Sequence, residues 1–73
     1  MSNFAERYGI KEIEWKDFLN LKENDIVYVV VEDKVYKSRV VRKPFYNADA
    51  DEPDWEVETT NGFCDVYSLC VAM

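Results

Sequence analysis

The side chains best suited to chemistry in this chain are oxygen ligands gathered in one segment. They are Asn47, Asp49, Asp51, Asp54 and Glu58. Oxygen ligands at alternating positions, with a carboxylate at the twelfth position, are typical of a calcium-binding loop. The segment lacks the glycine that such a loop needs for its sharp turn, and Pro53 interrupts it. The pattern therefore favours no metal and no cofactor, with calcium as the alternative.

The chain offers little for catalysis. It contains no histidine, which is the commonest general base and the commonest metal ligand. Without histidine, none of its three serines has the base that would activate it as a nucleophile. Cys64 and Cys70 are too few for a zinc site and are expected to be reduced, buried thiols, with a disulfide as the alternative. We therefore predict that the protein is not an enzyme.

Charge and hydropathy limit the class of partner that the protein can bind. The 73 residues include 15 acidic and 9 basic side chains, for a net charge of −6. This balance argues against direct contact with nucleic acid or with an anionic membrane surface, both of which attract basic proteins. The longest apolar run, Ile26–Val31, falls far short of the roughly 20 residues of a membrane span. The N-terminus shows no secretion signal, so we predict a cytoplasmic protein whose partner is another protein.

The first 20 residues are predicted to form a helical arm. Ser2–Tyr8 can form a short helix, and a second helical stretch is expected over Lys11–Leu19. Because a domain this small needs every large apolar side chain in its core, we expect the arm to pack on the rest of the chain. Trp15 or Phe18 is then expected to close one end of the core.

Residues 21–73 are predicted to contain five short strands, on the basis of β-branched runs, apolar–polar alternation and turn residues. In chain order the strands are expected at residues 26–31, 35–41, 55–60, 63–66 and 70–72. Pro44 is expected to end the second strand because it cannot donate to a ladder, which leaves Phe45–Pro53 as a long loop. Asn61-Gly62 is a strong hairpin signal, and one 3₁₀ turn fits before the last strand.

Two stretches resemble the SH3-like barrels. Leu21–Val29 is similar to their turn and first strand, and Gly62–Ala72 is similar to their strand, 3₁₀ turn and closing strand. The resemblance implies a mainly β fold, namely a five-stranded SH3-like small barrel at residues 21–73 with the arm packed on it. It concerns topology and not function. Signalling SH3 domains carry paired tryptophans where Trp55 stands alone here, so proline-rich peptide binding is not implied.

Charge is distributed unevenly along the sequence. Residues 32–43 carry five basic and two acidic side chains, whereas residues 44–73 carry seven carboxylates and no Lys or Arg. If the second and third predicted strands pair, cross-strand ion pairs can form between them. The side chains expected in these pairs are Lys37, Arg39, Glu56 and Glu58. The carboxylates of the predicted loop then remain without cations.

This loop and its aromatic flanks form the predicted partner-binding surface. Its members are Phe45, Tyr46, Asp49, Asp51, Glu52, Asp54 and Trp55. Aromatic side chains often dominate protein interfaces, so we predict a non-catalytic, small acidic protein-binding module. One alternative is a phage- or plasmid-type acidic inhibitor that mimics nucleic acid on a basic partner. A second is a small structural or accessory subunit, which a homo-oligomer would help to stabilise.

Overall fold

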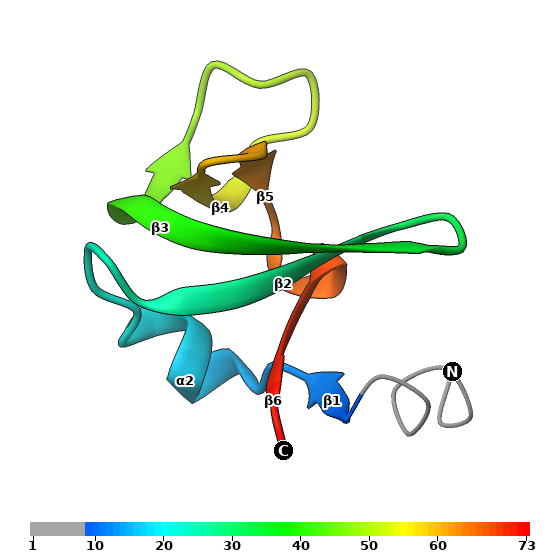
Figure 1. The fold of residues 1–73 in the computed structure, drawn as a ribbon. Helices are drawn as coiled ribbons and strands as arrows, with labels where there is room; N and C mark the ends of the chain where they lie inside the picture. The colour runs from blue at the N-terminus through cyan, green and yellow to red at the C-terminus, as the bar shows by residue number, and fades with distance from the viewer. Residues whose placement is uncertain (1–8) are drawn as a thin grey trace.

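A computed structural model describes residues 9–73, and the helix expected over Ser2–Tyr8 lies outside them. The elements are β1 (Ile10–Glu12), α2 (Trp15–Leu19), β2 (Ile26–Val31), β3 (Lys34–Asn47), β4 (Asp54–Thr59), β5 (Gly62–Cys64), the 3₁₀ turn η1 (Val66–Ser68) and β6 (Leu69–Ala72). The strands form one antiparallel sheet in the order β1-β6-β2-β3-β4-β5, with α2 packed beside it (Figure 1). The prediction of a mainly β fold is confirmed.

The sheet has six strands, not five, because a strand lies in the arm that was predicted to be helical. β1 pairs with β6, with Ile10 opposite Ala72. The helix predicted over Lys11–Leu19 is therefore wrong in its first half, and α2 has only five residues. Strand pairing to a distant segment outweighs the weak helical preference here. Among the described residues the sheet order begins at β1 and ends at β5, so the sheet is open and closure into a barrel is not confirmed.

β3 is much longer than predicted and continues through Pro44 to Asn47. Its first half pairs with β2 and its second half with β4. The register against β4 shifts between Arg42 and Phe45, and Pro44 lies in that irregular stretch, where its missing N–H interrupts no regular ladder. The prediction that Pro44 ends the strand is thus wrong. Phe45 and Tyr46 belong to β3, and the loop is reduced to residues 48–53.

The observed register also overturns the predicted ladder of ion pairs. Lys37 lies opposite Tyr28 and Arg39 opposite Ile26, both in β2. The two basic side chains therefore belong to the half of β3 that faces β2, whereas the two glutamates lie on β4. The residue opposite Glu58 is Arg42.

The core lies where α2, η1 and the inward faces of the strands meet. Its buried members are Ile13, Phe18, Leu21, Val27, Val29, Val40, Val57, Cys64 and Leu69. Phe18 is fully buried, as expected of a side chain that closes the core, whereas Trp15 on the same helix is 47% exposed. The inward side chains of β2 and β4 recur at every second position, which is the period of a strand with one face in the core.

Of two buried hydroxyl groups at the β4–β5 hairpin, Thr59 closes its turn and Ser38 ties the turn to β3. The Thr59 hydroxyl donates to the Gly62 carbonyl (3.0 Å) and accepts from the Asn61 N–H (3.0 Å). The Ser38 hydroxyl, on β3, bonds to the Asn61 side chain. The hairpin signal at Asn61-Gly62 therefore marks a real turn, although its two connecting residues are Thr60 and Asn61.

Candidate functional site

Three exposed aromatic side chains from distant segments meet on one surface. They are Trp15 from α2, Tyr46 from β3 and Trp55 from β4, and we call them the aromatic ridge. The ring centroids of Trp15 and Trp55 lie 6.5 Å apart at 86°, and those of Tyr46 and Trp55 lie 6.0 Å apart at 63°. Both are edge-to-face contacts, the arrangement that aromatic quadrupoles favour.

The ridge is positioned by the sheet on one side and by the core on the other. Tyr46 and Trp55 are direct partners in the β3–β4 register. Trp15 stacks on the fully buried Phe18, with ring centroids 5.6 Å apart. Nevertheless, Trp15, Tyr46 and Trp55 remain 47%, 53% and 37% exposed. Rings held in place before binding lose little conformational entropy when a partner covers them.

Phe45 does not join the ridge, because successive residues of a strand point to opposite faces of a sheet. Its ring makes an edge-to-face contact with Phe63 of β5, with centroids 5.9 Å apart. The guanidinium carbon of Arg42 lies 4.0 Å above the centre of the Phe45 ring, which is a cation–π distance. The structure therefore divides the predicted aromatic flanks between two faces.

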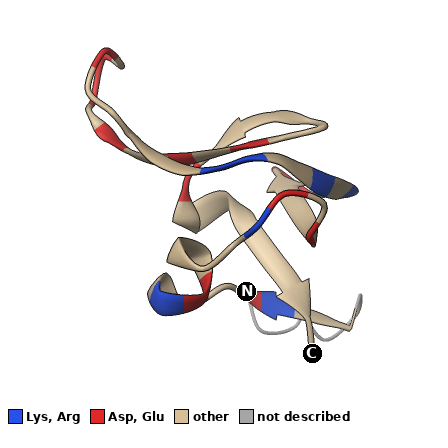
Figure 2. Ribbon diagram, turned by 90° about the vertical axis from the view of Figure 1, so that its left-hand side faces the viewer, with Lys and Arg blue, Asp and Glu red and all other residues tan. Residues whose placement is uncertain are grey.

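The predicted carboxylates remain together, on the loop between β3 and β4 and at the start of β4 (Figure 2). Asn47 holds both ends of this loop: its side-chain oxygen accepts from the Asp49 N–H (3.2 Å), and its amide nitrogen donates to Glu56 (3.0 Å). Asp54 accepts from the N–H of Trp55 (2.8 Å). Asp49, Asp51 and Glu52 are exposed.

The calcium alternative gains no support from this geometry. Within residues 9–73, no three side chains of Asp, Glu, Cys or His come close enough together to hold a metal ion. Two of the side-chain oxygens that the spacing suggested as calcium ligands already accept hydrogen bonds from the backbone. They belong to Asn47 and Asp54.

Trp15 is the member of this surface that the sequence did not indicate. Its spacing from Phe18 fits a packed helix face, which is why either residue could be expected in the core. The structure buries Phe18 and leaves the Trp15 indole against Trp55, 40 positions later in the chain. No local pattern encodes that contact.

Both cysteines are free and buried, as predicted. Burial raises the pKa of the Cys64 thiol, a hydrogen bond with Thr59 offsets part of that rise, and the nearby carboxylates of Asp65 and Glu56 add to it. Burial likewise raises the pKa of the Cys70 thiol, with a smaller contribution from Glu12. The neutral thiol is the form that the folded protein favours.

These raised pKa values predict a loss of stability at alkaline pH. The unfolded chain releases thiol protons from about pH 8.5, before the folded protein does. The free energy of unfolding should therefore be unaffected by the thiols below that pH and should fall as the pH rises toward the folded-state values. Urea unfolding from pH 7 to 10 measures this slope. A variant with Cys64→Ala and Cys70→Ala should show a shallower fall, and an unchanged slope would contradict the prediction.

Comparisons of the chain with protein-family models, with curated proteins and with solved structures find no match. In the described part of the chain, no helix is long and apolar enough to cross a membrane. The function is therefore inferred from the protein's own surface.

Proposed function

We propose that this protein is a non-catalytic protein-binding module that contacts its partner through the aromatic ridge and the neighbouring loop carboxylates. The observation that carries the proposal is the ridge itself. Trp15, Tyr46 and Trp55 contact one another, yet each keeps more than a third of its surface in solvent. Tryptophan and tyrosine are enriched among the residues that dominate binding energy, and a continuous exposed apolar patch commonly marks an interaction site.

An SH3-like small barrel is the proposed framework for this module. The strands from β2 to β5 are consecutive antiparallel neighbours, and β6 returns to β2 directly after η1. This order supports the proposal, and β1 is then an addition at the edge formed by β6. The free thiols support a reducing, cytoplasmic environment.

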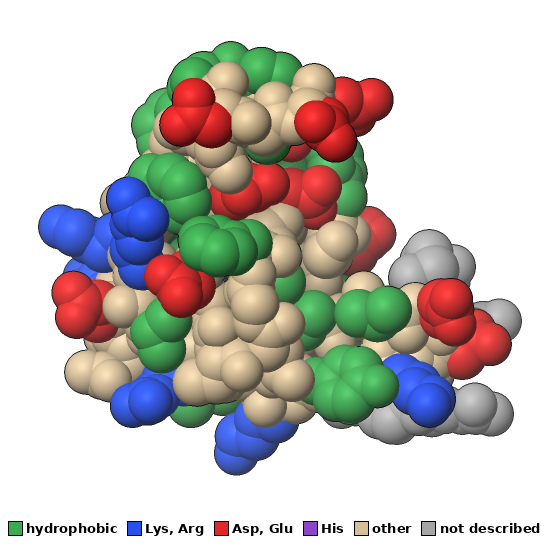
Figure 3. All heavy atoms as spheres, turned by 90° about the horizontal axis from the view of Figure 1, so that it is seen from above, with side chains coloured by type: hydrophobic (Ala, Val, Ile, Leu, Met, Phe, Trp, Pro, Cys, Tyr) green, Lys and Arg blue, Asp and Glu red, His purple; other side chains and the backbone are tan. Residues whose placement is uncertain are grey.

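An acidic inhibitor of a basic partner is the second candidate, and the separation of charge favours it. Figure 3 shows several carboxylates around the upper end of the view, whereas basic side chains lie along its left and lower edges, with a few carboxylates among them. Residues 44–73 contribute seven carboxylates and no cation. Such a surface would attract a basic groove by long-range electrostatic forces that salt screens.

Affinity capture from the native host separates the two candidates. Wild-type protein, a variant with Tyr46→Ala and Trp55→Ala, and the control Tyr36→Ala serve as baits at low and high salt. Tyr36 is a similarly exposed tyrosine of β3 outside the ridge. We expect a partner that binds wild type and control at both salt concentrations and does not bind the ridge variant. A basic partner that salt releases, and that the ridge variant still captures, would establish the inhibitor instead.

A further inference from the structure

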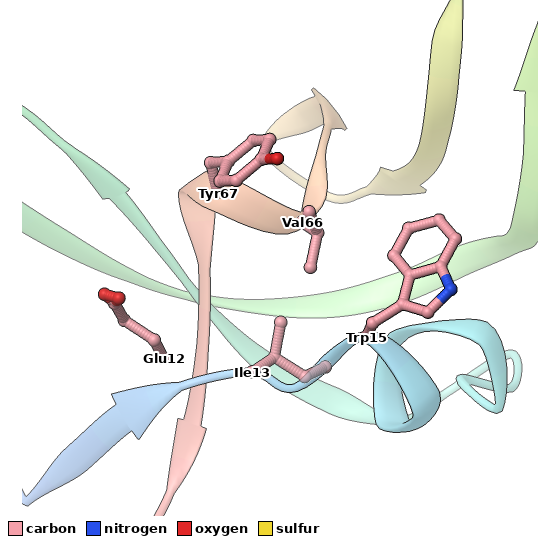
Figure 4. Close-up of a pocket in the computed structure, with 5 residues that line it drawn as sticks. All are labelled: Glu12, Ile13, Trp15, Val66 and Tyr67. Atoms are coloured by element: carbon pink, nitrogen blue, oxygen red, sulfur yellow. The ribbon is translucent and has the colours of Figure 1, made fainter.

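An open groove lies beside the aromatic ridge, between η1 and the segment that joins β1 to α2. It encloses about 550 Å³ and is lined by Glu12, Ile13, Trp15, Val66 and Tyr67. Figure 4 shows Tyr67 and Trp15 on opposite sides of the hollow, with Ile13 and Val66 between them. The groove is therefore apolar, with an aromatic ring at either side and a carboxylate at one end.

The Tyr67 side chain lines this groove and does not belong to the core. Its side chain is 87% exposed. Its backbone is nonetheless fixed, because the Asp65 carboxylate caps η1 by accepting from the N–H groups of Tyr67 and Ser68 (both 3.1 Å) and from the Ser68 hydroxyl (3.2 Å). A large ring on a fixed backbone, with little packing of its own, is well placed to contact a partner.

A second hollow, of about 540 Å³, lies beside the 48–53 loop and is acidic. Its lining comprises Ala50, Asp51, Glu52, Pro53, Asp54, Glu56 and Asp65. Five of these seven residues are carboxylates. Within the described chain, neither the groove nor this acidic hollow has Lys or Arg among its lining residues.

The two hollows adjoin at the start of η1. Asp65 lines the acidic hollow, and the next residue, Val66, lines the groove. Trp15 lines the groove and contacts Trp55 of β4, whereas Asp54 and Glu56, the chain neighbours of Trp55, line the acidic hollow and point to the opposite face of that strand. A ligand that leaves the groove past Val66 therefore meets the carboxylates, of which Asp65 is the first.

We propose that the groove and the acidic hollow together bind an extended basic segment of the partner protein, which places an apolar side chain between Trp15 and Tyr67 and lysine or arginine over the carboxylates. This inference rests on the proposed protein-binding function and specifies the chemistry of the partner. If an acidic or uncharged segment covered this surface, the negative charges of the five carboxylates would have no cation beside them. Unpaired charges of this kind disfavour the binding of wrong partners. Arginine and lysine also pack their stems and charges well against aromatic rings.

The size of the molecule sets the length of this segment. Its largest extent is 35 Å. At about 3.3 Å per residue, some eleven extended residues cross that distance. A peptide of twelve residues is thus long enough to occupy both hollows.

Selection from a random twelve-residue peptide library displayed on phage tests the proposal on the full protein. We expect enriched clones to carry an apolar or aromatic residue next to several lysines or arginines. A synthetic peptide of the most enriched sequence is then titrated against the variants by tryptophan fluorescence, since both tryptophans of the chain lie at the site. Tyr67→Ala should weaken binding about tenfold, and Tyr36→Ala should change it less than twofold.

A second part of the experiment tests the role of charge. It compares two variants that each lose two negative charges, at different places on the surface. Asp51→Asn with Glu52→Gln, in the acidic hollow, should weaken binding about threefold at low salt and less at high salt. Glu32→Gln with Asp33→Asn, in the turn between β2 and β3, should have no measurable effect.

Several results would overturn the basic-segment proposal. They are a failure to enrich any clone, enrichment of acidic or uncharged sequences, and equal binding to wild type and Tyr67→Ala. Each of these leaves the protein-binding module standing if the native partner is still lost from the Tyr46→Ala, Trp55→Ala variant. Conversely, a ridge variant that retains its native partner removes the proposed function, whatever peptides are selected.

Discussion

Replacing Phe18 with alanine is expected to destabilise the domain by about 3–5 kcal/mol, the usual loss for a fully buried phenylalanine. Phe18 has no exposed surface, belongs to the core and supports Trp15 by stacking. A domain of this size commonly has a free energy of unfolding of only about 5–15 kcal/mol. The substitution should therefore remove a large part of the stability. Urea unfolding followed by circular dichroism measures the loss.

Leu19 provides the matched control on the same helix. It is 41% exposed, so Leu19→Ala should change the free energy of unfolding by about 0.5 kcal/mol or less. Both substitutions introduce alanine, which favours helix, so a difference between them reflects burial and not helix propensity. Equal effects of the two substitutions would show that α2 does not close the core as the structure indicates.

The elements that the sequence predicted correctly are those with a local signal. Ile26–Val31 is a β-branched run, and β4 alternates core and outward residues, so both were found near their true bounds. The turn before β5 was found because Asn-Gly is a hairpin signal, although only Gly62, with a φ of 103°, adopts the positive φ that the signal implies. The 3₁₀ turn before the last strand was likewise anticipated.

The missed elements depend on contacts between distant residues. Ile10–Glu12 is too short to show a strand period and becomes a strand because it pairs with β6 at the other end of the chain. The length of β3 depends on a shift of register around Pro44, and no local sequence pattern indicates that shift.

The same limit applies to the candidate surface. The sequence placed Tyr46, Trp55 and the loop carboxylates together, because they are close along the chain. It placed Phe45 with them because a loop was expected there, whereas a continuing strand sends Phe45 to the other face. The contribution of Trp15 requires its contact with Trp55 of β4, which only the three-dimensional structure reveals.

The aromatic ridge is expected to contribute much more to partner binding than the loop carboxylates do. The variant with Tyr46→Ala and Trp55→Ala should weaken binding of the native partner at least a hundredfold, since interface hot spots contribute about 2 kcal/mol or more each. Neutralising the loop carboxylates should weaken binding only about tenfold, because exposed ion pairs contribute about 0.2–1 kcal/mol each. That variant combines Asp49→Asn, Asp51→Asn, Glu52→Gln and Asp54→Asn.

Calorimetric titration of the purified partner at low and high salt distinguishes these contributions. High salt should nearly abolish the difference between wild type and the neutralised loop while leaving the effect of the ridge variant intact. Asn at position 54 retains an oxygen that can accept from the Trp55 N–H, so the start of β4 should remain in place. Tyr46→Phe with Trp55→Phe controls for the fold and should keep most of the affinity, because an aromatic ring stays at each of the two positions. If the neutralised loop instead abolishes binding and the ridge variant does not, the carboxylates are the recognition element, and the acidic inhibitor replaces the aromatic module.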